Sequence, residues 1–200
     1  MIRLVLVAVM SLLALTQAIA APAIGQKAPA FSAIDSNGKL RSLSEFKGRI
    51  VVLEWTNNGC PYVRKHYGSG NMQKVQADLT AQGAVWLSII SSAPGKQGFV
   101  NGAEANQLTA ARSAHPTAVL LDPTGEVGHA YEAQTTPHMF IIDRQGILRY
   151  MGAIDDQPTT DPSSLQSART YVREAFAAVS AGRPVEVTAT DPYGCSVKYQ

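Results

Sequence analysis

The sequence predicts an α/β fold in which helices cover both faces of a central mixed β-sheet. Short apolar segments rich in β-branched residues alternate along the chain with segments of helical periodicity, and this order is typical of α/β sandwiches. A turn at residues 143–146 separates two of the apolar segments in the manner of a β-hairpin. At least one pair of strands is therefore antiparallel, and the sheet is expected to be mixed.

The predicted strands are short and are bounded by clusters of glycine, proline or asparagine. They cover residues 31–34, 49–55, 85–90, 117–121, 138–142 and 147–151, and the first runs into a hairpin loop at 35–38. Segment 49–55 is apolar at most of its positions. Such a continuous apolar run indicates a strand that is buried on both faces.

Capping residues and helix breakers place the helices. A short helix is expected to begin at Cys60 and Pro61, because proline is tolerated in the first turn, and to stop near residues 68–70. Asn71 is expected to cap a second helix, which Gly83 ends. Two further helical segments are expected at residues 101–113 and 126–131.

The last helix has the clearest pattern. Asp161 is expected to cap it, Pro162 to open it, and Gly182 and Pro184 to end it. Its apolar stripe consists of Leu165, Ala168, Val172, Ala175, Phe176 and Val179. One domain at residues 21–184 is thus expected, followed by a tail at 185–200 that carries Cys195.

Residues 1–20 are expected to be a secretory signal peptide. Arg3 precedes an apolar stretch, and Ala18 and Ala20 form a small-x-small cleavage pattern. The apolar core is shorter than the roughly 20 residues that a membrane span needs. We therefore expect export, cleavage after Ala20 and no stable insertion into the membrane.

The charge balance argues against several classes of partner. The chain carries a net charge of +2 at pH 7, and loss of Arg3 with the leader leaves +1. A nearly neutral protein without runs of lysine or arginine offers no electrostatic attraction for nucleic acid. The sequence also contains no phosphate-binding loop, no serine nucleophile elbow and no His-Glu-x-x-His metal pair. No cofactor is therefore expected.

Cys60 is the main candidate for chemistry. It follows an apolar strand and begins a helix, where free backbone N–H groups and the helix dipole favour the reactive thiolate. Arg64 and Lys65, one turn further on, add positive potential, and Thr56 and Asn57 are expected to keep the surroundings of the sulfur polar. The alternative is an inert, buried cysteine, the commonest fate of a free thiol.

Three segments together resemble the redoxin and peroxiredoxin-like (AhpC/TSA-type) branch of the thioredoxin-like superfamily. They are the lead-in Gly25-Gln26-Lys27-Ala28-Pro29-Ala30-Phe31, the strand Val51-Val52-Leu53-Glu54-Trp55 followed by Cys60-Pro61, and Thr135-Thr136-Pro137-His138 with the apolar run after it. The resemblance spans about residues 24–153. It implies a thioredoxin-like fold and an exported, periplasmic thiol oxidoreductase or peroxidase with an antioxidant role.

The resemblance also implies roles for residues around the thiol. Cys60 would attack a peroxide or a disulfide, and a thiol reductant protein would restore it. Trp55 and Pro61 would shape the pocket, and Thr136 with a cis Pro137 would form the opposing wall. Backbone groups of Thr136 could then hold an extended substrate by strand-like hydrogen bonds.

The sequence departs from both well-known chemistries of that superfamily. Val63 stands where a dithiol motif would have its second cysteine, and Leu53 and Asn57 stand where a peroxiredoxin carries proline and threonine or serine. That family also polarises the peroxide with an arginine, for which Arg144 and Arg149 are the candidates. The choice between a peroxide and a disulfide substrate therefore stays open.

Cys195 lies in a Gly-Cys-Ser-Val-Lys segment that resembles the ending of some redoxin-like proteins. Three interpretations remain. Cys195 could resolve oxidised Cys60 through a reversible disulfide, form a permanent disulfide staple with it, or stay unpaired. The first is favoured, because a disulfide at a helix N-terminus should be labile.

Two functions from other classes are alternatives to this interpretation. A copper-handling protein of this fold would use two neighbouring cysteines, whereas here Cys60 has only distant histidines (His66, His115, His129 and His138) or the apolar-patterned Met72 and Met139 as companions. A non-catalytic module could instead bind a peptide on the proline edge without redox turnover. For His138 itself we expect an ordinary strand side chain.

Overall fold

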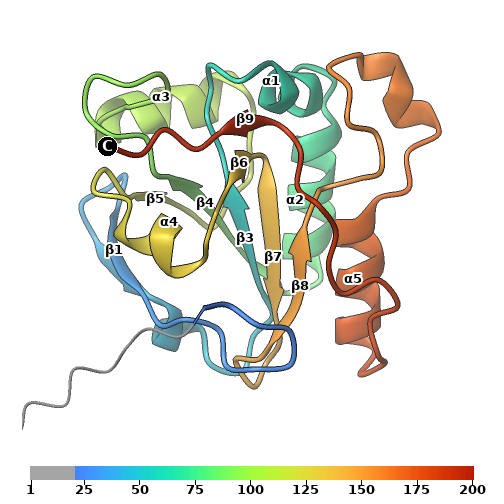
Figure 1. Cartoon of the computed structure of the whole chain (residues 1–200). Coiled ribbons are helices and arrows are strands. Elements are labelled where there is room, and N and C mark those ends of the chain that lie inside the picture. Colours follow the sequence, from blue (N-terminus) through green and yellow to red (C-terminus); the bar gives the residue numbers. More distant parts are fainter. Residues whose placement is uncertain (1–20) are drawn as a thin grey trace, which may run out of the picture.

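The computed structural model describes residues 21–200 and confirms the α/β fold with a mixed sheet (Figure 1). Seven strands lie in the order β2-β1-β5-β4-β3-β7-β8. They are β1 (Ser32–Asp35), β2 (Leu40–Ser42), β3 (Val51–Trp55), β4 (Val85–Ile90), β5 (Ala118–Leu121), β7 (His138–Ile142) and β8 (Leu148–Gly152). The three strands β3, β4 and β5 are parallel, and the other neighbours pair antiparallel.

Helices cover both faces of the sheet, as the sequence predicts. They are α1 (Pro61–Gly68), α2 (Asn71–Ala81), α3 (Gly102–Ala111), α4 (Glu126–Ala130) and α5 (Tyr171–Ser180), with 3-10 turns at Leu43–Phe46 and Pro162–Gln166. One apolar cluster joins α1, α2 and α5 to one face. A second cluster joins α4 and the lead-in segment to the other face.

Strand β3 contributes to both clusters because its side chains alternate between the faces. All five of its residues are buried. Val52 packs towards α1, α2 and α5, whereas Leu53 and Trp55 pack with Tyr131 and Phe140 on the other side. This central position fixes the end of β3, where the loop to Cys60 begins.

Two predicted helix starts are wrong. Asp161 caps only a 3-10 turn through the Ser163 backbone N–H, and α5 begins at Tyr171. The cause is the Arg169 backbone, which pairs with Asp156 on both its N–H and its carbonyl and holds the chain extended before α5. Leu165 and Ala168 therefore do not belong to the stripe of α5.

The second wrong start concerns α2. Gly70, with a positive φ of 77°, is its N-cap, and Asn71 is its first helical residue. The Asn71 side chain instead faces Nδ1 of His66 over 2.8 Å. Glycine reaches this left-handed conformation without steric cost, so it makes the sharp change of direction between α1 and α2.

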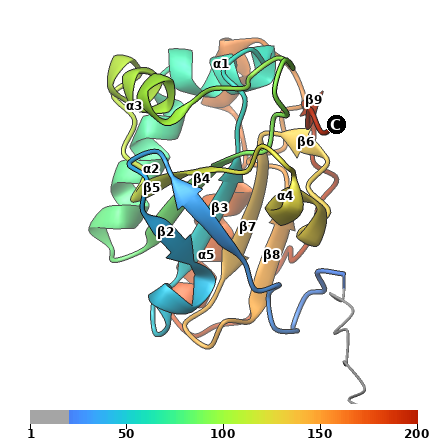
Figure 2. The ribbon, with the colours of Figure 1, turned by 90° about the vertical axis from the view of Figure 1, so that its left-hand side faces the viewer.

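The C-terminal tail returns to the end of the sheet where α1 begins (Figures 1 and 2). There β9 (Cys195–Ser196) pairs antiparallel with β6 (Thr135–Thr136), in the register Thr135↔Ser196 and Thr136↔Cys195. Two further backbone bonds hold the tail: Val197 N–H donates to Gln134 O over 2.9 Å, and Ala93 N–H donates to Lys198 O over 2.8 Å.

The predicted signal peptide, residues 1–20, lies outside the described residues. Across residues 21–200, no helix has the length and apolar character to cross a membrane.

Candidate active site

Cys60 is the N-cap of α1, as the sequence predicts. Its φ and ψ of −80° and 126° are extended, Pro61 opens the helix, and Arg64 N–H donates to Cys60 O over 2.9 Å. The Val63 N–H, in the first turn of α1, favours the ionised form of the sulfur and so lowers the pKa of Cys60. The side chain is 0 % exposed and packs in the cluster shared with α2 and α5.

The loop before Cys60 is shaped by Asn57. Its side-chain oxygen accepts the Gly59 N–H over 2.8 Å, and its amide group donates to Gln97 O over 3.1 Å. Thr56 N–H continues the sheet by donating to Ile89 O over 3.0 Å. The two residues thus build the loop, and their described hydrogen bonds do not go to the sulfur. This differs from their expected role as polar neighbours of Cys60.

Thr136 lies directly opposite the thiol. The Thr136–Pro137 peptide bond is cis, as the resemblance implies. Cys60 Sγ donates to the backbone oxygen of Thr136 over 3.1 Å, across 76 positions of sequence. The first turn of α1 and strand β6 therefore form two walls around one sulfur atom.

Cys195 comes to the same place from the C-terminal tail. Its pairing with Thr136 in β9 sets its side chain beside Cys60, so that the two thiols shift each other's pKa. Both cysteines are free thiols, with Cys60 buried and Cys195 half-buried. The structure thus brings together two thiols that lie 135 positions apart in the sequence.

The two thiols differ in acidity. Burial opposes ionisation of Cys60, but hydrogen bonds from the Cys195 side chain and the Val63 N–H outweigh it, so the pKa of Cys60 falls below its ordinary value. The Thr136 carbonyl favours the protonated form, yet it is one acceptor against several donors. Burial, together with the hydrogen bond and charge of Cys60, raises the pKa of Cys195 to about 11. Cys60 is therefore the more acidic thiol of the pair.

A polar cluster anchors the tail two residues before Cys195. The Tyr193 hydroxyl donates to Asp155 and lies 3.3 Å from Nε2 of His66 and 3.4 Å from Nζ of Lys65. The Tyr193 ring packs against Tyr62 with centroids 5.7 Å apart. Burial lowers the pKa of His66 to about 3, with the Lys65 charge adding to the effect, so the imidazole is neutral. Three residues of α1 thus hold the tail that carries the second thiol.

A buried carboxylate on β3, that of Glu54, joins α1 to the sheet by a hydrogen bond. Glu54 on β3 accepts hydrogen bonds from the Tyr67 hydroxyl at 2.8 Å, Trp86 Nε1 at 2.9 Å, Ser88 Oγ at 2.8 Å and Gln76 Nε2 at 3.2 Å. These donors come from α1, α2 and β4. Because each bond fixes a different element to β3, Glu54 holds the helix that begins at Cys60 against the sheet.

Comparison with known families agrees with this geometry. The family model described as AhpC/TSA family matches residues 24–151. The chain belongs to the AhpC/TSA family. A search of curated proteins finds no match.

Solved structures place this AhpC/TSA protein among thioredoxin-like folds. An uncharacterized conserved protein from Geobacillus kaustophilus is 25% identical with a TM-score of 0.75, over 89% of this chain and 93% of that one. A hypothetical protein from Sinorhizobium meliloti 1021 has the same identity and TM-score, over 89% and 95%. A secreted Mycobacterium tuberculosis disulfide oxidoreductase is 16% identical with a TM-score of 0.53, over 74% and 95%, and shares the fold alone.

Trp55 and Pro61 take different places in this AhpC/TSA protein. Pro61 is exposed in the first turn of α1, next to Cys60. Trp55 is buried on the opposite face of the sheet, where its indole donates to Ser91 Oγ over 3.0 Å and packs on Phe140 with centroids 5.1 Å apart. Its expected role in shaping the pocket is therefore wrong, because β3 turns this side chain away from Cys60.

The basic residues considered for the site lie elsewhere. Arg144 lies in the turn between β7 and β8, and Arg149 donates to Asp143 at the start of that turn. Because β7 runs antiparallel to β3, the turn lies at the opposite end of β3 from Cys60. Arg64 donates to Asn58 O over 3.0 Å, and Lys65 donates to Gln157 O over 2.8 Å. Neither charge is among the described causes that lower the pKa of Cys60; those causes are hydrogen bonds, including ones from the Val63 backbone and the Cys195 side chain.

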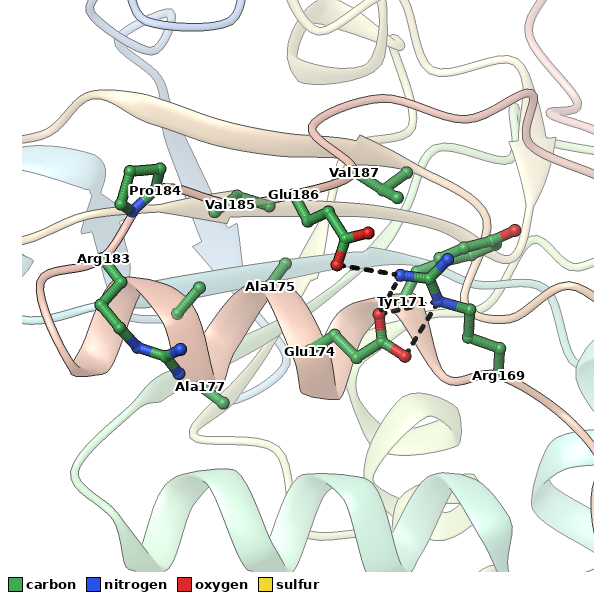
Figure 3. A pocket seen from close by; sticks show the side chains of 11 residues that line it. Arg169, Tyr171, Glu174, Ala175, Ala177, Arg183, Pro184, Val185, Glu186 and Val187 are labelled. Atoms are coloured by element: carbon green, nitrogen blue, oxygen red, sulfur yellow. Dashed lines mark hydrogen bonds and ion pairs between the residues drawn. The ribbon is translucent and has the colours of Figure 1, made fainter.

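The remaining candidates are core or surface residues. His138 is buried and packs on Phe140 with ring centroids 4.4 Å apart, as a strand side chain, and Met72 and Met139 lie in the core. Within residues 21–200, no three side chains of His, Cys, Asp or Glu gather in a metal-binding arrangement. A hollow of about 380 Å³ between α5 and segment 183–187 contains Arg169, which its neighbours Glu174 and Glu186 neutralise (Figure 3). It holds neither cysteine.

Sequence reasoning missed the residues that support the thiols. Glu54 carried a signal, since it is the single charge inside an apolar strand. Asp155 and Tyr193 carried none, because nothing local to either residue indicates a partner 38 positions away.

Proposed function

We propose that this protein is an exported thiol oxidoreductase in which Cys60 is the nucleophile and Cys195 resolves the oxidised product. The observation that carries the proposal is the position of the two cysteines: Cys60 begins α1 with its sulfur 3.1 Å from the Thr136 carbonyl oxygen, and Cys195 pairs with Thr136 in the neighbouring strand. A lowered pKa favours the thiolate of Cys60 and makes Cys60 the better leaving group of the two cysteines. The raised pKa of Cys195 keeps the second thiol protonated until Cys60 has reacted.

With a peroxide, the Cys60 thiolate would attack one oxygen, and the O–O bond would break. The departing oxygen takes up a proton, giving an alcohol or water, and Cys60 becomes a sulfenic acid. Cys195 then attacks the Cys60 sulfur, the hydroxyl leaves as water with the Cys195 proton, and a Cys60–Cys195 disulfide forms. With a disulfide substrate, Cys60 would form a mixed disulfide and release one thiol, and the attack of Cys195 would release the other.

The cycle closes only if another dithiol protein reduces the disulfide and is itself oxidised. The predicted signal peptide supports a place outside the cytoplasm. We infer a periplasmic protein that depends on an exported thiol reductant. The two thiols and this reductant suffice for the chemistry, so the proposal includes no metal or organic cofactor.

The first experiment is peptide mass mapping of the mature protein before and after stoichiometric hydrogen peroxide. We expect a Cys60–Cys195 linkage to appear on oxidation and to disappear with a thioredoxin-type reductant. Cys195→Ser is expected to accumulate sulfenic acid at Cys60, and Cys60→Ser should leave Cys195 unmodified. Unchanged thiols at both positions after exposure to peroxide and to a disulfide would contradict the proposal.

A further inference from the structure

The tail occupies a backbone edge beside the nucleophile. Strand β9 pairs with β6 through Thr136↔Cys195 and Thr135↔Ser196, and Val197 N–H extends the ladder to Gln134 O. This edge of β6 faces Cys60, because the Thr136 carbonyl oxygen is 3.1 Å from the Cys60 sulfur. The edge next to the reactive thiol is therefore already paired.

A free strand edge in this position would bind an extended polypeptide by adding it as another strand. A cysteine of such a peptide, set opposite Thr136, would lie where Cys195 lies. The tail thus takes the place of a bound peptide, and it supplies the sulfur that such a peptide would supply.

Contacts on both sides keep the tail in place. Before β9, Tyr193 is held by Asp155, His66 and Lys65. After β9, Lys198 O accepts the Ala93 N–H, and the Tyr199 ring stacks on His129 with centroids 4.1 Å apart while its hydroxyl donates to Ala133 O over 2.8 Å. An extended peptide that pairs with β6 would have to displace this segment, whereas a molecule that does not bind by strand pairing does not need this edge.

Gly194 makes the close approach of the tail possible. Its φ is 138°, and a methyl group on its Cα would overlap the Thr136 carbonyl oxygen and lie 2.8 Å from the carbonyl carbon. A side chain at position 194 would push β9 away from β6 while leaving the anchors at Tyr193 and Tyr199 unchanged.

We propose that residues 193–199 form a built-in strand that excludes extended polypeptides from Cys60, so that its external substrate is a molecule that does not bind by strand pairing. Gly194 is the specificity-determining residue of this arrangement. The inference rests on the proposed function, because it assumes a reactive Cys60. It deepens that function by limiting which substrates reach the thiol.

The test compares two mixed-disulfide probes, which release the same chromophore when a thiolate attacks them. One is the mixed disulfide of thionitrobenzoate with cysteamine, and the other is its mixed disulfide with the central cysteine of an extended peptide of about ten residues, long enough to form a strand. The full mature chain carries Cys195→Ser, so that Cys60 is its single thiol. In each reaction the Cys60 thiolate attacks the probe's cysteine or cysteamine sulfur, forms a mixed disulfide and releases thionitrobenzoate.

We expect the peptide probe to react at least about tenfold more slowly than the small probe in the Cys195→Ser protein. Adding Gly194→Ala should raise the peptide rate relative to the small-probe rate by roughly tenfold, which corresponds to about 1.4 kcal/mol. Gly182→Ala is the matched control, because Gly182 also has a positive φ, of 67°, but has no atom within 4 Å of an added methyl. It should leave the ratio unchanged.

Hydrogen exchange of the Ser196 and Val197 amides reports whether β9 has been released. Should Gly194→Ala unfold the protein, Tyr199→Ala releases the other end of the same segment and should raise the same ratio. Equal rates for both probes in the Cys195→Ser protein, or a ratio unmoved by release of β9, would overturn the inference and leave the two-cysteine cycle intact. A Cys60 that reacts with neither probe in any variant would overturn both proposals.

Discussion

At the scale of single residues, the two cysteines are made unequal by what surrounds each. The Val63 N–H and Cys195 favour the ionised form of Cys60, while the negative charge of Cys60 opposes ionisation of Cys195. The same pair interaction therefore moves the two pKa values in opposite directions. This asymmetry assigns the attacking role to Cys60 without any difference in residue type.

Replacing Cys195 tests that assignment. Cys195→Ala removes a donor from the Cys60 sulfur, so the pKa of Cys60 should rise. Cys195→Ser keeps an O–H donor in its place and should raise the pKa less. The ultraviolet absorbance of the thiolate, followed against pH, measures both variants. Identical titration curves for the alanine and serine variants would show that the Cys195 hydrogen bond does not govern the acidity of Cys60.

Glu54 makes a second prediction at this scale. Glu54→Leu would leave the buried donors of Tyr67, Trp86 and Ser88 without their acceptor. We expect a loss of roughly 3 kcal/mol or more in the free energy of unfolding, since each unpaired buried donor costs about 1–3 kcal/mol. Glu54→Gln keeps one acceptor oxygen and should cost less. Urea denaturation of both variants separates the two, and equal losses would argue against the network.

The sequence predicted residues whose signal is local. Cys60 stood out because a buried strand, a short loop and a proline all surround it, and each has a direct physical meaning for a helix start. The place of Cys195 depended on the folding of the whole chain, so the residues alone left three alternatives. The hydrogen bonds of Asn57 also could not be foreseen, because its partner Gln97 lies 40 positions away.

At the scale of elements, α1 positions both cysteines of the site. Its N-terminus holds Cys60, and its side chains Tyr62, Lys65 and His66 hold Tyr193 of the tail. One rigid helix thus sets the position of both thiols. The relative placement of Cys60 and Cys195 should therefore depend on the contact between α1 and Tyr193.

Tyr193→Phe tests this dependence. The ring contact with Tyr62 can remain, but the hydroxyl bonds to Asp155, His66 and Lys65 are lost. Cys195 should be held less firmly beside Cys60, so the Cys60–Cys195 disulfide should become several-fold easier to reduce. Equilibration with a glutathione redox buffer measures this constant directly.

Tyr62→Phe is the matched control, because it removes the hydroxyl of the other tyrosine in the pair and leaves the hydrogen bond from Tyr193 to Asp155 intact. It should leave the equilibrium constant close to that of the unchanged protein. If Tyr193→Phe lowers thermal stability but leaves this constant unaltered, Tyr193 has a structural role and does not position Cys195.

Elements were predicted well where the pattern is set by neighbours in sequence. The strands β1, β3, β4, β5, β7 and β8 and the helices α1, α3 and α4 fall close to their expected ranges, whereas the short strands β2, β6 and β9 had no expected range. The start of α5 failed because a contact between Arg169 and Asp156, 13 positions apart, competes with the helical pattern of residues 162–170. Tertiary hydrogen bonding overrode local propensity at that point.

At the scale of the whole molecule, buried histidines couple folding to pH. Burial lowers the pKa of both His66 and His138 to about 3, from an ordinary value of 6.5. Around His66, Asp155 Oδ2 at 3.9 Å favours the charged form, and Lys65 opposes it. The folded protein therefore holds both imidazoles neutral across most of the acidic range.

The sign of the pH effect follows from proton uptake. Between pH 6.5 and about 3 the unfolded chain binds protons at these two positions and the folded chain does not, so the free energy of unfolding falls as the pH falls. Each proton contributes at most about 1.4 kcal/mol per pH unit. From pH 7 to pH 5 we expect a loss of about 2–4 kcal/mol, measured as a lower urea midpoint.

Single replacements separate this effect from a general loss of stability in acid. His138→Asn removes one of the two titrating groups and should flatten the dependence between pH 7 and pH 5, even if it lowers stability at both values. His115→Asn, at an exposed position, is the matched control and should leave the slope unchanged. Because the prediction concerns a slope, the cavity or lost contact that either replacement introduces cancels. An unchanged slope in His138→Asn would mean that this imidazole is charged in the folded protein, against the burial that surrounds it.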